Sequence, residues 1–242
     1  MHPPIILQYE NRSPRPFEGF LANINAYAHA HGYSHFVVDG SDSTSYPPYY
    51  AKVFEMMRLC QVPEYDGALV LYLDVDCVVV QDHIRLEDIA EQFLQGDRVI
   101  LYAGSVERFN AGHLLIRNTR EARRVLSTWM ECYDPRAWTF DGSWSCHDPK
   151  NPSLECKWSQ RYYEQGDFKI FIMRDPNLTR YLVFDPNHFI FKSCDTFGEG
   201  TPLCFILHLC SRSKFKPKAV DDMIAYGMPR DKALAIVESN MK

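Results

Sequence analysis

Residues 68–80 read ALVLYLDVDCVVV, an apolar run that carries two carboxylates, Asp74 and Asp76. Because successive side chains of a strand point to opposite faces, one strand over this run places both aspartates on the same face. The apolar residues on either side are typical of a central parallel strand covered by helices. Two like charges in such a place are costly unless a cation compensates them, and a divalent metal prefers oxygen ligands.

The run therefore predicts a metal-binding Asp-x-Asp motif at the mouth of a sheet. An alternative is a strand that ends near Leu73, with the two aspartates opening a solvated turn. We favour the continuous strand, because Cys77–Val80 resumes the apolar pattern at once.

The composition bounds the class of protein. The 242 residues suffice for one sizeable α/β domain, with two small domains as the alternative, and 26 basic against 31 acidic residues give a net charge of −5. This charge excludes the global basic field of a nucleic-acid-binding protein. No apolar run approaches the roughly 20 residues of a membrane helix, and the N-terminus lacks a signal-peptide pattern, so we expect a soluble cytoplasmic protein. The eight cysteines show no CxxC pair and are expected to be reduced, with Cys146 and Cys156 as an open alternative pair.

Alternating strands and helices precede the Asp-x-Asp run. Ile5–Tyr9 predicts a first strand, and Phe17–His31 has helical spacing that is closed by Gly32. His35–Val38 predicts the second strand and Tyr49–Gln61 the second helix. Two such units are typical of a doubly wound, Rossmann-like sheet, mixed but mainly parallel, whose ligands bind beyond the carboxyl ends of the strands.

The elements after the run continue the mixed pattern. Further strands are predicted at Arg98–Ala103, Phe109–Arg117, Lys169–Met173, Tyr181–Phe184 and Phe205–Leu209. Further helices are predicted at Ile84–Phe93, Glu121–Tyr133, Ser159–Gln165 and Val220–Ser239. Residues 134–155 are rich in Pro, Trp, Cys, Asp and Ser and have little periodicity. A loop this long is usually functional or disordered, and its tryptophans argue against disorder.

Four stretches, in this order, resemble the motifs of GT-A nucleotide-sugar glycosyltransferases. They are Tyr50-Ala51-Lys52, Tyr72-Leu73-Asp74-Val75-Asp76, Phe109-Asn110-Ala111-Gly112 with Ile116-Arg117-Asn118, and Leu207-His208-Leu209-Cys210-Ser211 with Lys214. The chain is most similar to the galactomannan galactosyltransferase and α-1,6-mannosyltransferase type, then to the glycogenin-type galactosyltransferases, over roughly residues 5 to 218. The resemblance implies a GT-A fold and transfer of a sugar from a UDP- or GDP-sugar to a hydroxyl of a glycan acceptor.

The resemblance also implies a role for each matching residue. Asp74, Asp76 and His208 would hold Mn²⁺ or Mg²⁺, and a nitrogen donor beside carboxylates favours Mn²⁺. The metal would be a Lewis acid for the leaving nucleoside diphosphate. The remaining donor-binding candidates are Lys52 and Lys214 for the diphosphate, Asn110, Ala111 and Gly112 for the sugar, and Gln8, Tyr9 and Asp39 for the base and ribose.

Several of these residues have an ordinary structural alternative. His208 on an apolar strand is also consistent with a core histidine, Lys52 with a solvated helix lysine, and Gly112 with a bulge. The chain also departs from the glycogenin-type pattern. Ser211 stands where those enzymes have Gly, and Phe215-Lys216 replaces Pro-Trp.

The catalytic candidates are Asp76, Gln160 and Asp148. The family's Asp-Gln or Glu-Gln pair, which lies near the reacting sugar carbon, matches only Ser159-Gln160. A base for an inverting reaction would then come from the Trp-rich loop, which offers Asp148 and also Asp141 and Glu155. A retaining reaction could use the leaving phosphate instead.

We expect one GT-A domain over residues 1–242, with a nucleotide-binding part at about 1–80, an acceptor-side part at about 81–218 and a tail helix at 219–242. Two other classes remain. Haloacid-dehalogenase phosphatases also place Asp-x-Asp after an apolar strand, but usually the first strand, with Thr where this chain has Val78. A nucleotide-sugar-binding module without turnover is the non-enzyme alternative.

Overall fold

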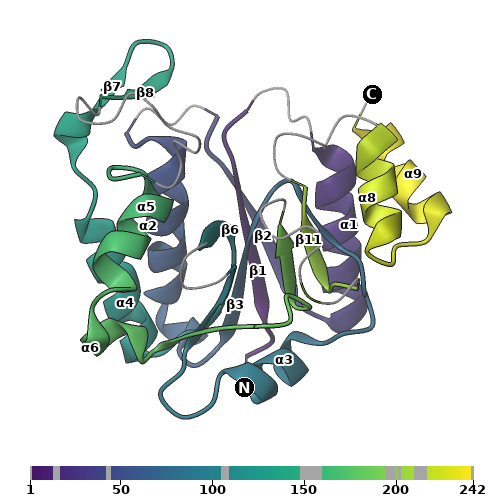
Figure 1. Ribbon diagram of the computed structural model, residues 1–242, viewed down its shortest axis with the longest axis horizontal. Helices are drawn as coiled ribbons and strands as arrows, with labels where there is room; N and C mark the ends of the chain where they lie inside the picture. The colour runs from purple at the N-terminus through teal and green to yellow at the C-terminus, as the bar shows by residue number, and fades with distance from the viewer. Residues whose placement is uncertain are drawn as a thin grey trace.

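The computed structural model describes residues 2–12, 17–41, 45–104, 109–147, 160–193, 200, 203–209 and 217–240. Its centre is a six-stranded sheet in the order β2-β1-β3-β6-β5-β9 (Figure 1). The strands are β1 (Ile5–Glu10), β2 (Ser34–Asp39), β3 (Leu69–Asp74), β5 (Ile100–Ala103), β6 (Asn110–Arg117) and β9 (Leu182–Phe184). Strand β1 is parallel to β2 and β3, and β5 is parallel to β9, whereas β6 is antiparallel to both of its neighbours. The sheet is therefore mixed and mainly parallel, as predicted.

Two smaller sheets accompany the central one. A three-stranded sheet has the order β10-β11-β4 and consists of β10 (Phe191–Ser193), β11 (Ile206–His208) and β4 (Cys77–Val79). Strands β10 and β11 are parallel, and β4 is antiparallel to β11. A two-stranded hairpin of β7 (Trp138–Phe140) and β8 (Trp144–Cys146) projects at the top of Figure 1.

Helices flank the central sheet on both sides (Figure 1). On the left of the view lie α2 (Pro48–Cys60), α4 (Arg120–Glu131), α5 (Glu164–Asp167) and α6 (Pro176–Thr179), together with the π-helical turn η4 (Phe168–Ile172). On the right lie α1 (Glu18–His31), α8 (Pro217–Ala225) and α9 (Arg230–Ser239), with α3 (Leu86–Phe93) at the bottom. Two short 3₁₀ turns are η1 (Pro63–Tyr65) and η2 (Pro135–Ala137).

Strand β3 contributes to two hydrophobic cores, one on each face of the sheet. Val70 and Tyr72 pack with Trp129 and other residues of α2, α4 and η4. Leu71 and Leu73 belong to the core that includes α1, α3 and the three-stranded sheet. Burial on both faces explains why this stretch is apolar almost throughout instead of alternating.

The expectation of one continuous strand over residues 68–80 is wrong. Strand β3 ends at Asp74, Val75 and Asp76 form a turn, and the chain enters a different sheet as β4 at Cys77. The turn is not the solvated one of the alternative interpretation, because Val75 is 2% and Asp76 is 8% exposed. An apolar run on both sides of a buried turn gives the same sequence pattern as one long strand.

Most other predicted strands and helices are confirmed to within about two residues. The helix predicted at Val220–Ser239 is divided into two, α8 and α9, which are separated by residues 226–229. The strand predicted at Lys169–Met173 is wrong: Phe168–Ile172 forms a π-helical turn that buries Phe168 and Ile172. A short apolar run does not distinguish a buried strand from a buried helical turn. The helix predicted at Ser159–Gln165 is limited to Glu164–Asp167 in the described chain, and the hairpin β7–β8 was not predicted.

Among the described residues, no helix combines the length and hydrophobicity that a bilayer crossing requires. Cys60, Cys77, Cys132 and Cys204 are free thiols, as predicted for them. Cys156 lies outside the described residues, so its pairing with Cys146 stays an open alternative.

Candidate metal centre

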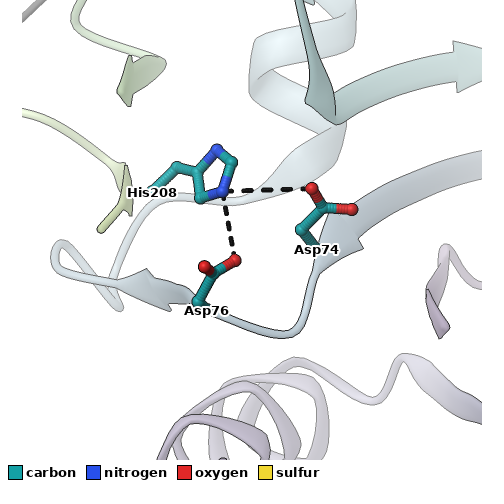
Figure 2. Close-up of side chains that lie close together, drawn as sticks. All are labelled: Asp74, Asp76 and His208. Carbon is teal, nitrogen blue, oxygen red and sulfur yellow. Dashed lines mark ion pairs between the residues drawn. The ribbon is translucent and has the colours of Figure 1, made fainter. Parts of the chain in front are cut away.

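Three potential metal ligands meet where the two larger sheets adjoin. Asp74 is the last residue of β3, Asp76 lies in the turn that follows, and β4 then pairs with β11 so that Cys77 is opposite His208. The Nε2 atom of His208 is 3.1 Å from Oδ1 of Asp76 and 3.9 Å from Oδ2 of Asp74 (Figure 2). One donor atom from each residue lies within 4.8 Å of the others. Residues that are far apart in sequence thus form one cluster at the carboxyl end of β3.

The shape and chemistry of this cluster fit a divalent cation. Two carboxylates and one imidazole are ligands that Mn²⁺ accepts, and the oxygens also suit Mg²⁺. The ring of His208 lies directly over Gly112, where an added Cβ would be 2.4 Å from its Cε1 atom and 2.6 Å from its Nδ1 atom. His113 packs edge-on against the same ring, with the two centroids 5.4 Å apart. The imidazole therefore faces the carboxylates from a tightly enclosed position.

Lys52 forms buried ion pairs beside the cluster. Its Nζ atom is 3.3 Å from Oδ1 of Asp74 and 3.0 Å from Oε1 of Glu164, and Lys52 is 7% exposed. Burial is the largest influence on the pKa of Lys52 and lowers it, but the two carboxylates outweigh burial and hold the pKa above its ordinary value. The hydroxyl of Tyr72 also donates a 2.7 Å hydrogen bond to Oδ1 of Asp74. Lys52 is thus a charged, buried partner of a candidate ligand and not a solvated helix lysine.

Glu164 and Gln165 were missed by the sequence reasoning. Glu164 is 4% exposed, and Gln165 accepts a 3.1 Å hydrogen bond from the backbone N–H of Ala111 through Oε1. Burial raises the pKa of Glu164, while Lys52 opposes this shift. The two residues link the Asn-Ala-Gly segment to the Lys52 and Asp74 ion pair. The signal was present in the sequence: Glu164-Gln165 is itself a Glu-Gln pair, five residues after the Ser159-Gln160 alignment.

The Asn-Ala-Gly segment begins β6, and the side chain of its asparagine holds it in place. Oδ1 of Asn110 accepts a 2.8 Å hydrogen bond from the N–H of Gly112, and both Asn110 and Ala111 are buried. The Gly112 carbonyl accepts a hydrogen bond from the thiol of Cys77, with 3.7 Å between the sulfur and oxygen atoms. These contacts join β6 to β4 and place Gly112 under His208.

The predicted base- and ribose-binding residues lie at the ends of the first two strands. Parallel pairing of β1 with β3 sets Tyr9 beside Asp74, and Gln8 donates a 3.3 Å hydrogen bond to the Asp74 carbonyl. Gln8 also contacts Nε2 of His35 at 2.9 Å. Asp39, the last residue of β2, accepts a 3.0 Å hydrogen bond from the N–H of Ser41. The three candidates therefore share the edge of the sheet that carries the metal cluster.

The remaining candidates are Gln160, which lies in the described part of the chain, and three residues that lie outside it. Gln160 is in the turn before α5, where its carbonyl accepts a 3.2 Å hydrogen bond from the N–H of Tyr163. Asp148, Glu155 and Lys214 lie outside the described residues. Their predicted roles stay predictions.

The arrangement of elements is that of solved glycosyltransferases. A glycosyltransferase involved in the glycosylation of the major capsid of PBCV-1 superposes on 93% of this chain and 99% of its own, with a TM-score of 0.61 and 12% identity. Mouse xyloside xylosyltransferase 1 superposes on 86% of this chain and 98% of its own, with a TM-score of 0.50 and 12% identity. No protein-family model and no curated protein matches the sequence.

These similarities establish the fold, which is the GT-A fold that the motifs predicted.

Proposed function

We propose that this protein is a metal-dependent glycosyltransferase that moves a sugar from a UDP- or GDP-sugar to a hydroxyl of a glycan acceptor. The observation that carries the proposal is the meeting of Asp74, Asp76 and His208 at the carboxyl end of β3. Open α/β sheets bind their ligands at this edge. Two solved structures with the same fold are glycosyltransferases by name, which supports the same class of reaction here.

Asp74, Asp76 and His208 would hold a divalent cation, with Mn²⁺ favoured by the imidazole nitrogen. When bound, such an ion supplies Lewis-acid stabilisation of the negative charge that builds on a departing diphosphate. Lys52 adds a permanent positive charge on the same side, held in place by Asp74 and Glu164. Lys214 remains a candidate for a second such charge.

We propose that the donor sugar lies against the surface that the Asn110–Gly112 segment and the Glu164-Gln165 pair form together. The hydrogen bond from Ala111 to Gln165 fixes these two segments against each other. In the resembling enzymes an acidic-Gln pair lies near the reacting sugar carbon, and Glu164-Gln165 fits that place by its contact with Lys52. Gln8, Tyr9 and Asp39 would contact the base and ribose, and the chain would function as one GT-A domain.

Donor binding provides a direct test. Purified protein is screened by thermal unfolding against UDP- and GDP-sugars with and without Mn²⁺, because a ligand that binds only the folded state raises stability in proportion to its affinity. We expect one donor to give a clear shift that requires the metal, and slow metal-dependent release of nucleoside diphosphate from that donor.

The variant Asp76→Ala separates the proposed site from the fold. We expect it to remain folded, to lose the Mn²⁺-dependent shift and to lose turnover. Asp82→Ala, which removes a carboxylate from an exposed ion pair with Lys232, is the matched control and should behave as the wild type. Full metal-dependent activity in Asp76→Ala would contradict the proposal, whereas donor binding without any turnover would identify a binding module.

A further inference from the structure

The hairpin β7–β8 has two chemically different faces. Its strands pair Trp138 with Cys146, Thr139 with Ser145, and Phe140 with Trp144. Because directly paired residues share a face and successive residues alternate, one face carries the three aromatic rings. The opposite face carries Thr139 and Ser145, whose hydroxyls are 2.9 Å apart. None of the paired side chains on the aromatic face is charged.

The base of the aromatic face is fixed to the rest of the molecule. Trp138 is 5% exposed, and its indole N–H donates a 3.2 Å hydrogen bond to the carbonyl of Tyr162. Its ring packs against Tyr49 and Tyr163, with centroid separations of 5.5 Å and 5.1 Å. A two-stranded hairpin has little stability of its own, so these contacts hold it in place.

At the tip of the same face Phe140 is open to solvent, and Trp144 beside it is half-buried. Phe140 is 46% exposed, and its ring centroid is 5.3 Å from that of Trp144 at an interplanar angle of 52°. Burial of Phe140 therefore does not explain why the chain carries a large apolar ring at this position. Two neighbouring rings on a fixed hairpin form a surface suited to stacking.

The aromatic face leads to the candidate site. Tyr49 lies one helical turn before Lys52 on α2, and Tyr163 directly precedes Glu164. Lys52 and Glu164 are the ion pair that adjoins Asp74. Figure 1 shows the hairpin above α2, at the edge of the molecule where the parallel strands β1 and β3 end. An extended acceptor on the hairpin would thus be directed toward the proposed donor pocket.

We propose that Phe140 and Trp144 form a stacking platform for neutral sugar rings of the glycan acceptor. This inference rests on the proposed function and adds the acceptor's binding surface and chemical class. Uncharged rings suit the apolar C–H faces of neutral sugars and provide no partner for an acidic glycan. An aromatic side chain buries about 150–250 Å², so two rings cover much less than the roughly 800 Å² that each side of a stable protein interface contributes. The platform matches a short stretch of glycan better than a protein partner or a second copy of this chain.

The test measures glycan binding separately from catalysis. Full-length protein is titrated with short neutral xylo-, gluco-, manno- and galacto-oligosaccharides by calorimetry and ligand-observed NMR, with nucleoside diphosphate and Mn²⁺ present. We expect at least one series to bind, and Phe140→Ala and Trp144→Ala each to weaken that binding by about tenfold. Phe36→Ala removes a ring of similar exposure on β2 and should leave binding unchanged.

Hydrolysis of the donor by water, measured in the same variants, separates a failure of the stacking platform from a failure of the proposed transferase function. If Mn²⁺-dependent hydrolysis is present and Phe140→Ala and Trp144→Ala bind glycans as the wild type does, the platform is refuted and the proposed function stands. If no donor is turned over but glycan binding is lost in both variants, the platform stands and the transferase function fails. Absence of glycan binding by the wild type, or a wild-type dimer that both variants dissolve, also overturns the platform.

Discussion

Replacement of Gly112 by alanine tests whether this residue acts by accommodating His208. The added Cβ would lie 2.4 Å from Cε1 and 2.6 Å from Nδ1 of His208, and 2.9 Å from Oδ1 of Asn110. Contacts below 3.0 Å force something to move. The backbone itself tolerates the change, because the φ angle of Gly112 is not in the left-handed region. The perturbation is therefore steric and directed at one candidate metal ligand.

The size of the effect follows from overpacking. Extra atoms in a packed site typically cost about 1–3 kcal/mol, which corresponds to about 5–150-fold in an equilibrium constant. Asp76 at 3.1 Å and the edge of His113 hold the His208 ring near its present position. To relieve the clash, the ring must turn away from the carboxylates against these contacts, and the cost then appears as weaker metal binding.

Calorimetric titration with Mn²⁺ measures this loss, and thermal unfolding provides a second readout. At a Mn²⁺ concentration about 100 times the Kd, the wild-type protein gains about 2.7 kcal/mol of stability. At the same concentration, a variant that binds tenfold more weakly gains about 1.4 kcal/mol. We expect Mn²⁺ to stabilise Gly112→Ala by about 1.4 kcal/mol or less at this concentration, and the variant to retain a cooperative unfolding transition.

A double-mutant cycle with His208→Ala shows whether the loss of Mn²⁺ affinity in Gly112→Ala arises through His208. If Gly112 acts through His208, Gly112→Ala should cause little further loss of Mn²⁺ affinity once the imidazole is gone. An equal loss in both backgrounds would assign the effect to Asn110 instead. Wild-type Mn²⁺ affinity in the single variant would refute the steric argument altogether.

Two further predictions concern buried charge. Lys52→Met leaves Asp74 and Glu164 without their cation, so urea denaturation without metal should show a loss of about 3–5 kcal/mol. Addition of Mn²⁺, or the second substitution Glu164→Gln, should restore part of the lost stability. An equal loss in Lys52→Met without metal, in Lys52→Met with Mn²⁺ and in the double variant would contradict the ion-pair argument. Burial holds the pKa of His113 well below its ordinary value, so below about pH 6.5 the unfolded state binds more protons than the folded state does. The free energy of unfolding should therefore fall as the pH drops below about 6.5, by up to about 1.4 kcal/mol per pH unit. His113→Leu should flatten this slope between about pH 7 and 5 in denaturation curves, and an unchanged slope would contradict the assignment.

The sequence indicated the fold class and the residues of the metal cluster, but not how they come together. Apolar periodicity located β1, α1, β2 and α2 closely, because these elements alternate in a pattern that local spacing reveals. It did not reveal that residues 68–80 are divided between two sheets. A buried turn between two apolar strands has no polar signature, and only the pairing of β4 with β11 shows where the first strand ends.

Short-range pattern also failed around residues 159–173. The Glu-Gln pair at Glu164-Gln165 was overlooked because the motif was matched to Ser159-Gln160, five residues earlier in the sequence. The apolar run after it was assigned to a strand, although Phe168 and Ile172 are spaced for one face of a helical turn. In both cases the decisive contacts are long-range: Glu164 pairs with Lys52, and Phe168 stacks on Phe109 at a centroid separation of 4.2 Å.

The change of sheet after Asp74 is what makes the metal cluster possible. Had the strand continued, Asp74 and Asp76 would share a face of the central sheet, and β4 would not pair with β11. The turn at Val75 and Asp76 instead sends the chain into the smaller sheet, where pairing sets Cys77 opposite His208. A carboxylate at the end of one sheet, a carboxylate in the turn and an imidazole from the other sheet then enclose one space. The turn therefore determines the geometry of the candidate site as much as the identities of its ligands do.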